Sequence, residues 1–232
     1  IRLTLTFEHP ADAVVSRFFR DNRGLGPRER ATLAETVYNV LRKKLLFDHM
    51  APSGSGPKER RLAILGFHGP RDFLLGGLTD QEKNWLEQCD SVKPDDLMER
   101  HRHNLPEWLV QPLKDQLGAG FWPLVESLSQ SAPLDLRVNA LKEKRADVQK
   151  ELAKAAIKSV ATPYSPWGLR IEGKPALTKL DAFTRGAIEV QDEGSQIAAL
   201  LSKAKPGETV FDLCAGAGGK TLALGAMMGG KG

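Results

Sequence analysis

A glycine-rich hexapeptide at residues 214–219, Cys-Ala-Gly-Ala-Gly-Gly, places the strongest constraint on the fold. Residues 209–213, Thr-Val-Phe-Asp-Leu, precede it with the pattern of a strand, and residues 220–228 follow with the pattern of a helix. A strand, a glycine turn and a helix form the first unit of a doubly wound sheet. Ligands bind where such strands end, because backbone N–H groups and the helix N-terminus point there. The sequence therefore predicts a ligand site at this turn.

Three kinds of nucleotide-like ligand compete for the turn. A phosphate-binding P-loop requires G-x-x-x-x-G-K-[ST], but Cys214 stands where the first glycine is needed. A dinucleotide fingerprint requires G-x-G-x-x-G, but Thr221 replaces the third glycine after Gly216 and Gly218. S-adenosylmethionine has no pyrophosphate to clamp, and Asp212 would orient the turn or reach the amino group of that cofactor. An ordinary turn that needs glycine only for positive φ is the alternative.

The overall composition is that of a globular chain. It has 232 residues, 41% of them hydrophobic and 27% charged, which excludes a disordered or fibrous protein and allows one large domain or two small ones. The apolar runs fall short of the roughly 20 residues of a membrane span. Two cysteines make no disulfide framework, so we expect a reducing, cytoplasmic setting. We also expect a monomer, no metal and no membrane partner. Because Ile1 is not an initiator methionine, the sequence leaves open whether a leader peptide has been removed.

The positive charge is concentrated in one segment. Residues 131–190 hold 11 basic and 7 acidic residues, whereas residues 1–130 hold 18 of each and residues 191–232 hold 4 of each. This segment is either a solvated helix face or a surface that contacts phosphates. Its relevant lysines are Lys142, Lys144, Lys150, Lys154 and Lys158. A second basic cluster lies within residues 20–44.

Hydrophobic periodicity predicts an α+β protein. Helical spacing predicts two helices within residues 10–50 and further helices at 60–67, 73–75, 79–89, 95–101, 105–117 and 121–129. No segment before residue 130 alternates as a strand would. A small α+β module then follows, with strands at 134–139, 169–171 and 188–190 and helices at 145–157 and 177–183. Beyond it we expect a helix at 193–201, a strand at 209–213 and a helix at 220–228.

Residues 211–221, with the sequence F-D-L-C-A-G-A-G-G-K-T, closely resemble the cofactor motif of RNA (cytosine-5) methyltransferases of the Sun/RsmB (Nol1/Nop2/Sun) type. The usual form is D-x-C-A-A-P-G-G-K-T, and Gly216-Ala217 here replaces Ala-Pro, which keeps the turn small. The segment V-Q-D-E-G-S-Q at 190–196 is similar to the one before the family's catalytic domain, and L-R-V-N at 136–139 is similar to a strand of its RNA-binding subdomain. The resemblance covers residues 131–232.

The helical part resembles the family more loosely. Residues 10–12, Pro-Ala-Asp, and 28–30, Arg-Glu-Arg, are similar to the N-terminal extension of bacterial members, which is itself similar to the antitermination factor NusB. The resemblance implies a NusB-like RNA-binding or docking domain at 1–130 and an RNA-binding module at 131–190. It also implies the beginning of a Rossmann-like methyltransferase domain at 191–232, which the chain does not complete.

The resemblance also implies S-adenosylmethionine as cofactor and RNA, in the first place ribosomal RNA, as partner. The cofactor would lie over Cys214, Ala215, Gly216, Ala217, Gly218, Gly219 and Lys220. We expect Arg137 to pair with a phosphate and Asn139 to read a base edge or a ribose hydroxyl, with Arg20 and Arg23 as a second RNA contact. The alternative for Arg137 is an outward strand residue without a partner.

The implied reaction is methylation of carbon 5 of cytosine. In this family a cysteine thiolate first adds to carbon 6, and a second cysteine helps to release the product. Those cysteines lie well beyond the glycine turn, so we expect the catalytic residues after Gly232 and none in this chain. Cys214 matches the cofactor motif, and Cys89 is predicted to be a core residue. A non-catalytic RNA-binding protein is the alternative function.

Overall fold

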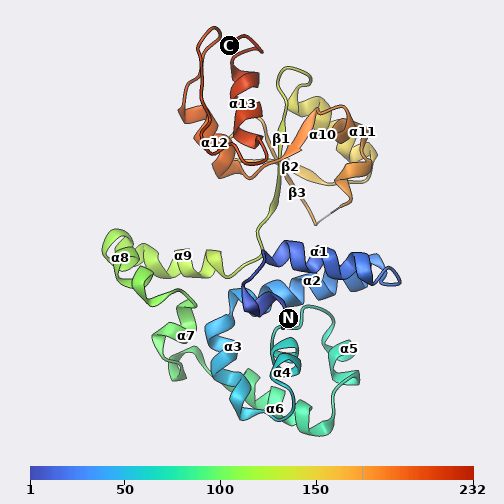
Figure 1. The fold of residues 1–232 in the computed structure, drawn as a ribbon, viewed down its shortest axis with the longest axis vertical. Helices are drawn as coiled ribbons and strands as arrows, with labels where there is room; N and C mark the ends of the chain where they lie inside the picture. The colour runs from blue at the N-terminus through green and yellow to red at the C-terminus, as the bar shows by residue number, and fades with distance from the viewer. Residues whose placement is uncertain (174) are drawn as a thin grey trace. The chain divides into compact units, whose positions relative to one another are not determined.

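The computed structural model describes residues 1–173 and 175–232, which form two compact units (Figure 1). The first unit comprises Ile1–Ser131 and the second Ala132–Gly232. Each unit has its own hydrophobic clusters. An α-rich chain with one small sheet is the α+β fold that the sequence predicts.

The first unit is entirely helical, as its periodicity predicts. Its helices are α1 (Ala11–Asp21), α2 (Pro27–Arg42), α3 (Lys44–Met50), α4 (Lys58–Leu65), α5 (Arg71–Gly76), α6 (Asp80–Ser91), α7 (Glu99–His103), α8 (Glu107–Leu117) and α9 (Phe121–Leu128). Single 3-10 turns lie at Thr4–Thr6, Ala51–Ser53, Pro94–Asp96 and Gly118–Gly120. Where the sequence predicts two helices in residues 10–50, the structure has three, because α2 ends at Arg42 and α3 begins at Lys44.

Local sequence signals set the ends of these helices. Pro27 occupies the first turn of α2, where its missing N–H costs nothing. At the start of α6, Thr79 accepts a hydrogen bond from the Glu82 N–H at 3.2 Å, and the Glu82 carboxylate accepts one from the Thr79 N–H at 2.9 Å. The helices bury small apolar clusters, one of which includes Trp85, Leu86 and Cys89. The prediction that Cys89 is a core residue is confirmed.

The second unit is built on a four-stranded antiparallel sheet. Its strands are β1 (Leu134–Val138), β2 (Ser159–Ala161), β3 (Gly168–Ile171) and β4 (Ile188–Val190), in the order β2-β3-β1-β4. Helix α10 (Arg145–Lys154) connects β1 to β2, and a 3-10 turn (Leu177–Lys179) and α11 (Asp181–Thr184) connect β3 to β4. This β-α-β-β-α-β arrangement is the ferredoxin-like supersecondary pattern.

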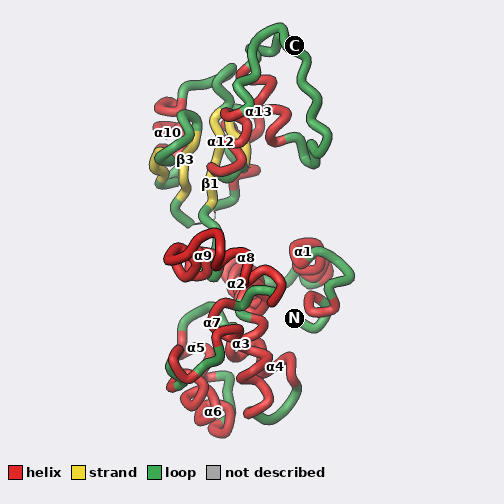
Figure 2. Tube along the Cα trace, turned by 90° about the vertical axis from the view of Figure 1, so that its left-hand side faces the viewer, coloured by secondary structure: helices red, strands yellow, loops and turns green. Residues whose placement is uncertain are grey.

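Helices cover both faces of this sheet (Figures 1 and 2). On one face Leu136 and Val138 pack in a cluster with Val148 and Leu152 of α10. On the other face lies α12 (Glu193–Leu201), which packs against β1. Every residue of β1 from its second to its last position is therefore buried, although the sequence alternates as a half-exposed strand would.

The strand β2 is missing from the sequence-based prediction. It contains only three residues, forms an edge of the sheet, and leaves Val160 62% exposed. Its pairing with β3, in which Ser159 faces Ile171, is a non-local contact. A run this short has too little alternation to reveal a strand.

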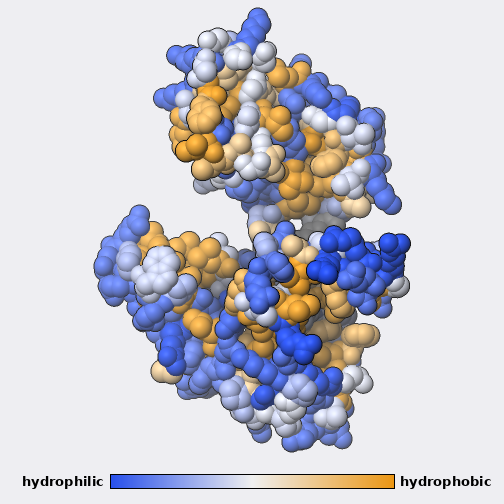
Figure 3. Space-filling model, viewed as in Figure 1, coloured by the Kyte–Doolittle hydropathy of each residue, from blue (hydrophilic) through white to orange (hydrophobic). Residues whose placement is uncertain are grey.

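The predicted strand at 209–213 is wrong, because these residues form no strand, whereas α13 (Gly219–Met227) forms as predicted. Phe211 is 84% and Leu213 is 81% exposed, and within the described part of the chain no strand pairs with this segment. A strand needs a neighbour to satisfy its backbone groups. On the face drawn in Figure 3, apolar surface gathers where Figure 1 shows α12 and the segment leading to α13.

Candidate functional site

The glycine turn adopts the backbone conformation that its composition predicts. Gly216 has φ +55° and Gly218 has φ +82°, both in the left-handed region that favours glycine. The N–H of Gly218 donates to the carbonyl of Ala215 at 2.8 Å, which closes the turn directly before α13. No atom lies within 4 Å of a Cβ built on Gly218, so its glycine is required by the backbone and leaves open space above it.

Asp212 fixes the turn to the following helix. Its Oδ2 accepts a hydrogen bond from Oγ1 of Thr221 at 2.8 Å. This contact bridges the six residues of the turn, because Asp212 lies before the turn and Thr221 lies in the first turn of α13. The expectation that Asp212 orients the turn therefore has a structural basis in a side-chain contact.

The other residues of the turn are largely open to solvent. Cys214, Ala215, Gly216, Ala217 and Lys220 are exposed, while Gly218 and Gly219 are half-buried. Cys214 is a free, exposed thiol. The second thiol, Cys89, is buried, and this burial raises its pKa, so it is poorly suited to act as a thiolate.

The segment 190–196 is held against the sheet by polar side chains. Asp192 caps α12 by accepting from the Ser195 N–H at 2.9 Å. Gln196, with no exposed surface, contacts the Ser165 hydroxyl at 2.6 Å and donates to the carbonyls of Gln191 and Leu136. These contacts hold the chain between β4 and α12 against β1 and the loop before β3.

Glu193 is the buried acid of this segment. Its Oε1 accepts hydrogen bonds from the backbone N–H groups of Tyr164 at 2.7 Å and Ser165 at 2.8 Å. Burial alone would raise the pKa of Glu193, but the hydrogen bonds from the backbone N–H groups of Ser165 and Tyr164, together with the positive charge of Arg170, outweigh it and the pKa is lowered. Glu193 is therefore ionised, and its hydrogen bonds hold the loop before β3.

Arg137 does not lie where an RNA phosphate contact would require it. Its side chain is 1% exposed and forms an ion pair with Glu189, its cross-strand neighbour on β4. Its Nε also donates to Oε1 of Gln191 at 2.7 Å. The alternation of β1 predicts an outward position for Arg137, but α12 packs against this strand and the guanidinium is buried. Both expectations for Arg137, phosphate pairing and an unpartnered outward position, are therefore contradicted by this geometry.

Asn139 is half-buried and occupied with backbone contacts. Its Nδ2 donates to the carbonyl of Gly186 at 3.3 Å, and its Oδ1 accepts from the Leu141 N–H at 3.1 Å. An asparagine that bonds the backbone two residues on shapes a turn. The structure thus places Asn139 in the connection that follows β1, with both ends of its amide engaged.

Arg20 and Arg23 lie together near the end of α1, and both are exposed. The neighbouring Arg30 packs over the ring of Phe19 at 5.6 Å and donates from Nε to the carbonyl of Leu25 at 2.9 Å. Arg30 therefore has a structural role in the α1–α2 connection. Arg20 and Arg23 keep their guanidinium groups at the surface, as a phosphate contact requires.

The five lysines named from the sequence in the basic segment lie at the surface. All of them are exposed. Lys150 pairs with Asp147 at 3.1 Å and Lys158 with Glu172 at 3.5 Å, both near the surface. Such exposed pairs contribute little stability and break easily in favour of a phosphate.

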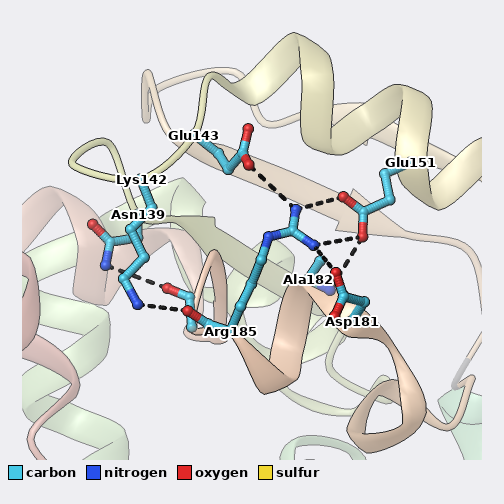
Figure 4. Close-up of polar contacts among 8 residues, drawn as sticks. Asn139, Lys142, Glu143, Glu151, Asp181, Ala182 and Arg185 are labelled. Carbon is cyan, nitrogen blue, oxygen red and sulfur yellow. Dashed lines mark hydrogen bonds and ion pairs between the residues drawn. The ribbon is translucent and has the colours of Figure 1, made fainter.

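Arg185 of this segment is half-buried and paired with several carboxylates (Figure 4). Arg185 contacts Glu151 from both terminal nitrogens, at 3.0 and 2.6 Å, and also reaches Glu143 and Asp181. Lys142 donates to the Arg185 carbonyl. Hydrogen bonds with carboxylates raise the pKa of Arg185, and the bond with Arg185 lowers that of Glu151. This cluster ties α10 to α11, and it leaves the guanidinium of Arg185 already paired.

Neither a membrane-spanning helix nor a cluster of metal-binding side chains is found among the described residues. Within 1–173 and 175–232, no helix has the length and apolar character needed to cross a membrane. In the same part of the chain, no three His, Cys, Asp or Glu side chains gather as a metal ion would require.

Comparison with known proteins shows which proteins this chain resembles. Residues 105–178 match the model of the ferredoxin-like domain of RsmF/B-like methyltransferases. The chain is 30% identical over 90% of its length to a probable ribosomal RNA small subunit methyltransferase B of Synechocystis sp. PCC 6803, of which it covers 55%. The chain is thus similar to RNA methyltransferases of the Sun/RsmB type. This agrees with the resemblance predicted from the glycine turn, residues 190–196 and residues 136–139.

Further relatives agree with this assignment. The ribosomal RNA small subunit methyltransferase B of Pasteurella multocida is 36% identical over 53% of the chain, which covers 28% of that protein. The crystal structure of PH0851 superposes on 98% of the chain and 59% of its own length, with a TM-score of 0.71 at 23% identity, and shows a shared fold. The chain spans about half the length of the Synechocystis relative.

The V-Q-D-E-G-S-Q segment at 190–196 predicts the family resemblance but no individual role for Gln191, Glu193 or Gln196. The available signal was the density of polar residues beside a predicted strand. Buried polar side chains need partners, and these three find them on β1 and in the loop before β3.

Proposed function

We propose that the full-length protein transfers a methyl group from S-adenosylmethionine to carbon 5 of a cytosine in ribosomal RNA. The observation that carries the proposal is the glycine turn at 214–219, open above Gly218 and fixed by Asp212 to α13, in a chain similar to RNA methyltransferases of the Sun/RsmB type. Relatives named as small subunit rRNA methyltransferases favour this substrate class.

The residues of the turn fit the cofactor. Left-handed φ values at Gly216 and Gly218 bring backbone N–H groups to the surface without side chains to obstruct them. The first N–H groups of a helix lack intrahelical partners and favour a negative charge. The amino-acid part of S-adenosylmethionine carries such a charge on its carboxylate. We therefore assign Cys214, Ala215, Gly216, Ala217, Gly218, Gly219 and Lys220 to the cofactor site.

The domain boundaries that we propose for the chain also follow from the family resemblance. Residues 191–232 would begin a Rossmann-like methyltransferase domain, whose remaining strands would pair with residues 209–213 and cover Phe211 and Leu213. Residues 1–130 would be a NusB-like domain. Within it, Arg20 and Arg23 are the proposed RNA contacts, because their side chains are exposed.

S-adenosylmethionine supplies an electrophilic methyl group, and the cytosine must be activated by a cysteine thiolate that adds to carbon 6. We assign that thiolate to a cysteine outside this chain. Cys214 belongs to the cofactor motif, and Cys89 is buried in the helical unit. The residues of this chain hold the cofactor and the RNA, and they leave covalent attack to the rest of the protein.

The test is methyl transfer by the full-length protein. Radiolabelled S-adenosylmethionine is incubated with small subunit rRNA, and the product is digested and analysed for 5-methylcytosine. The proposal expects label in 5-methylcytosine with the wild type and none with Gly218→Val. Label in another base would overturn the cytosine-5 assignment. RNA binding without any label, under conditions where the cofactor also fails to bind, would instead favour the alternative of a non-catalytic RNA-binding protein.

A further inference from the structure

Gln191 lies between the sheet and the glycine turn, and most of its polar groups already form hydrogen bonds within the protein. Its N–H donates to the carbonyl of Asp135 at 3.1 Å, and its own carbonyl accepts from Nε2 of Gln196 at 2.8 Å. Its side-chain Oε1 accepts from Nε of Arg137 at 2.7 Å. The residue is 7% exposed, so both its backbone and its side chain are held in place.

The chemistry of Arg137 fixes which end of the Gln191 amide points away from the sheet. A guanidinium has only hydrogen-bond donors, so the Gln191 atom that faces it must be the carbonyl oxygen. Arg137 is itself held by its ion pair with Glu189. The amide nitrogen Nε2 is therefore forced to the opposite side, and no hydrogen bond from it to another described residue is found.

This amide nitrogen lies at the N-terminus of α13. A Cβ built on Gly219, the first residue of that helix, would lie 3.4 Å from Nε2 of Gln191. The absence of a side chain at Gly219 lets the amide approach the turn. An oriented donor on a buried residue thus faces the helix end whose own N–H groups favour an anion.

We propose that Gln191 is a further residue of the ligand site, whose Nε2, oriented by Arg137, donates a hydrogen bond to the carboxylate of the bound cofactor. The proposal rests on the assignment of S-adenosylmethionine to the turn. Arg137 is a positioning residue in this arrangement, because it acts through Gln191 and does not touch the ligand. The polar face of β1 thereby contributes to cofactor binding instead of contacting RNA.

The experiment measures cofactor binding by calorimetry in the full-length protein. Gln191→Met removes the donor, and Gln191→Glu keeps an acceptor for Arg137 but replaces the donor with a carboxylate. Loss of a hydrogen bond to a charged group predicts an increase of about 10- to 100-fold in the Kd of S-adenosylhomocysteine. The Kd of 5′-methylthioadenosine, which lacks the amino-acid part, should change less than about twofold.

A matched control is Gln149→Met, because Nε2 of Gln149 donates to the Ser159 carbonyl at 2.9 Å, elsewhere in the same unit. Equal losses for both ligands, or equal losses in Gln149→Met, would show a general effect on folding and overturn the proposal. Unchanged S-adenosylhomocysteine binding in both Gln191 variants, with binding lost in Gly218→Val, would overturn the role of Gln191 alone. Unchanged binding in Gly218→Val as well would show that the cofactor site itself is misplaced.

Discussion

The hydroxyl of Thr221 donates to the carboxylate of Asp212 at 2.8 Å, and this one contact bridges the whole glycine turn. It joins a segment without regular structure to the first turn of a helix. Without it, only the Gly218-to-Ala215 backbone bond is found across the turn among the described residues. The shape of the proposed cofactor site therefore depends on a single side-chain hydrogen bond.

Thr221→Val should loosen the turn and weaken the binding of S-adenosylmethionine. A typical hydrogen bond contributes about 0.5–1.5 kcal/mol, so the Kd should rise roughly two- to tenfold. Thr221→Ser keeps the hydroxyl and should retain affinity near that of the wild type. Calorimetric titration of both variants is the measurement, and equal affinities for Val and Ser would show that the contact does not shape the site.

Gly218→Val should abolish methyl transfer while RNA affinity changes little. Gly218 has φ +82°, where a residue with a side chain costs about 1–2 kcal/mol, and the side chain would enter the open space above the turn. Gly225 offers a matched control, because it lies within α13 without positive φ and with open space around its Cβ position. Gly225→Ala should keep full methyl incorporation. Comparable losses in both variants would point to damage to α13 instead.

Cys214→Ser should reduce methyl transfer only mildly. The thiol is exposed within the cofactor motif, and serine is close to cysteine in size. The measurement is methyl incorporation together with trapping of a covalent adduct on RNA that contains 5-fluorocytosine. An adduct that persists in Cys214→Ser agrees with a nucleophile outside this chain. Its complete loss would make Cys214 the nucleophile and contradict our assignment.

The double variant Arg20→Ala/Arg23→Ala should weaken RNA binding. Both side chains are exposed, and removal of each arginine that binds a phosphate should reduce the salt dependence of log K by about one. Binding to rRNA fragments is measured over a salt series. Arg137→Ala, in contrast, should lower the thermal stability of the second unit, because it removes a buried side chain together with its contacts to Glu189 and Gln191. An unchanged salt slope in the double variant would remove α1 from the RNA surface.

Acid should destabilise the helical unit through Glu82. Hydrogen bonds from the Arg60 guanidinium and the Thr79 N–H lower the pKa of Glu82 from 4.5 to about 2. A depressed pKa in the folded state stabilises that state fully above pH 4.5, and this contribution is lost as the pH falls toward 2. Urea unfolding from pH 5 to pH 2 should therefore show a weaker pH dependence in Glu82→Gln. Glu87→Gln, at an exposed position of the same helix, should behave as the wild type.

Local features of this protein could be predicted from residue types alone. Thr79 and Glu82 mark the start of α6, and glycines at 216 and 218 adopt the left-handed conformations that few other residues tolerate. The burial of Cys89 follows from its place in an amphipathic helix. The family could also be identified, because its motifs are contiguous runs of sequence that need no three-dimensional information.

The sequence by itself determined the helices, the β1 strand and the glycine turn, because each depends on interactions between residues close in the chain. Only the tertiary structure decided what β1 faces. The covering of its polar face by α12 turned Arg137 from a predicted RNA contact into a buried partner of Glu189 and Gln191. Pairing partners likewise decided that residues 159–161 form a strand and residues 209–213 do not. Burial and strand pairing are relations between distant segments, and local periodicity contains no record of which segment will cover which face.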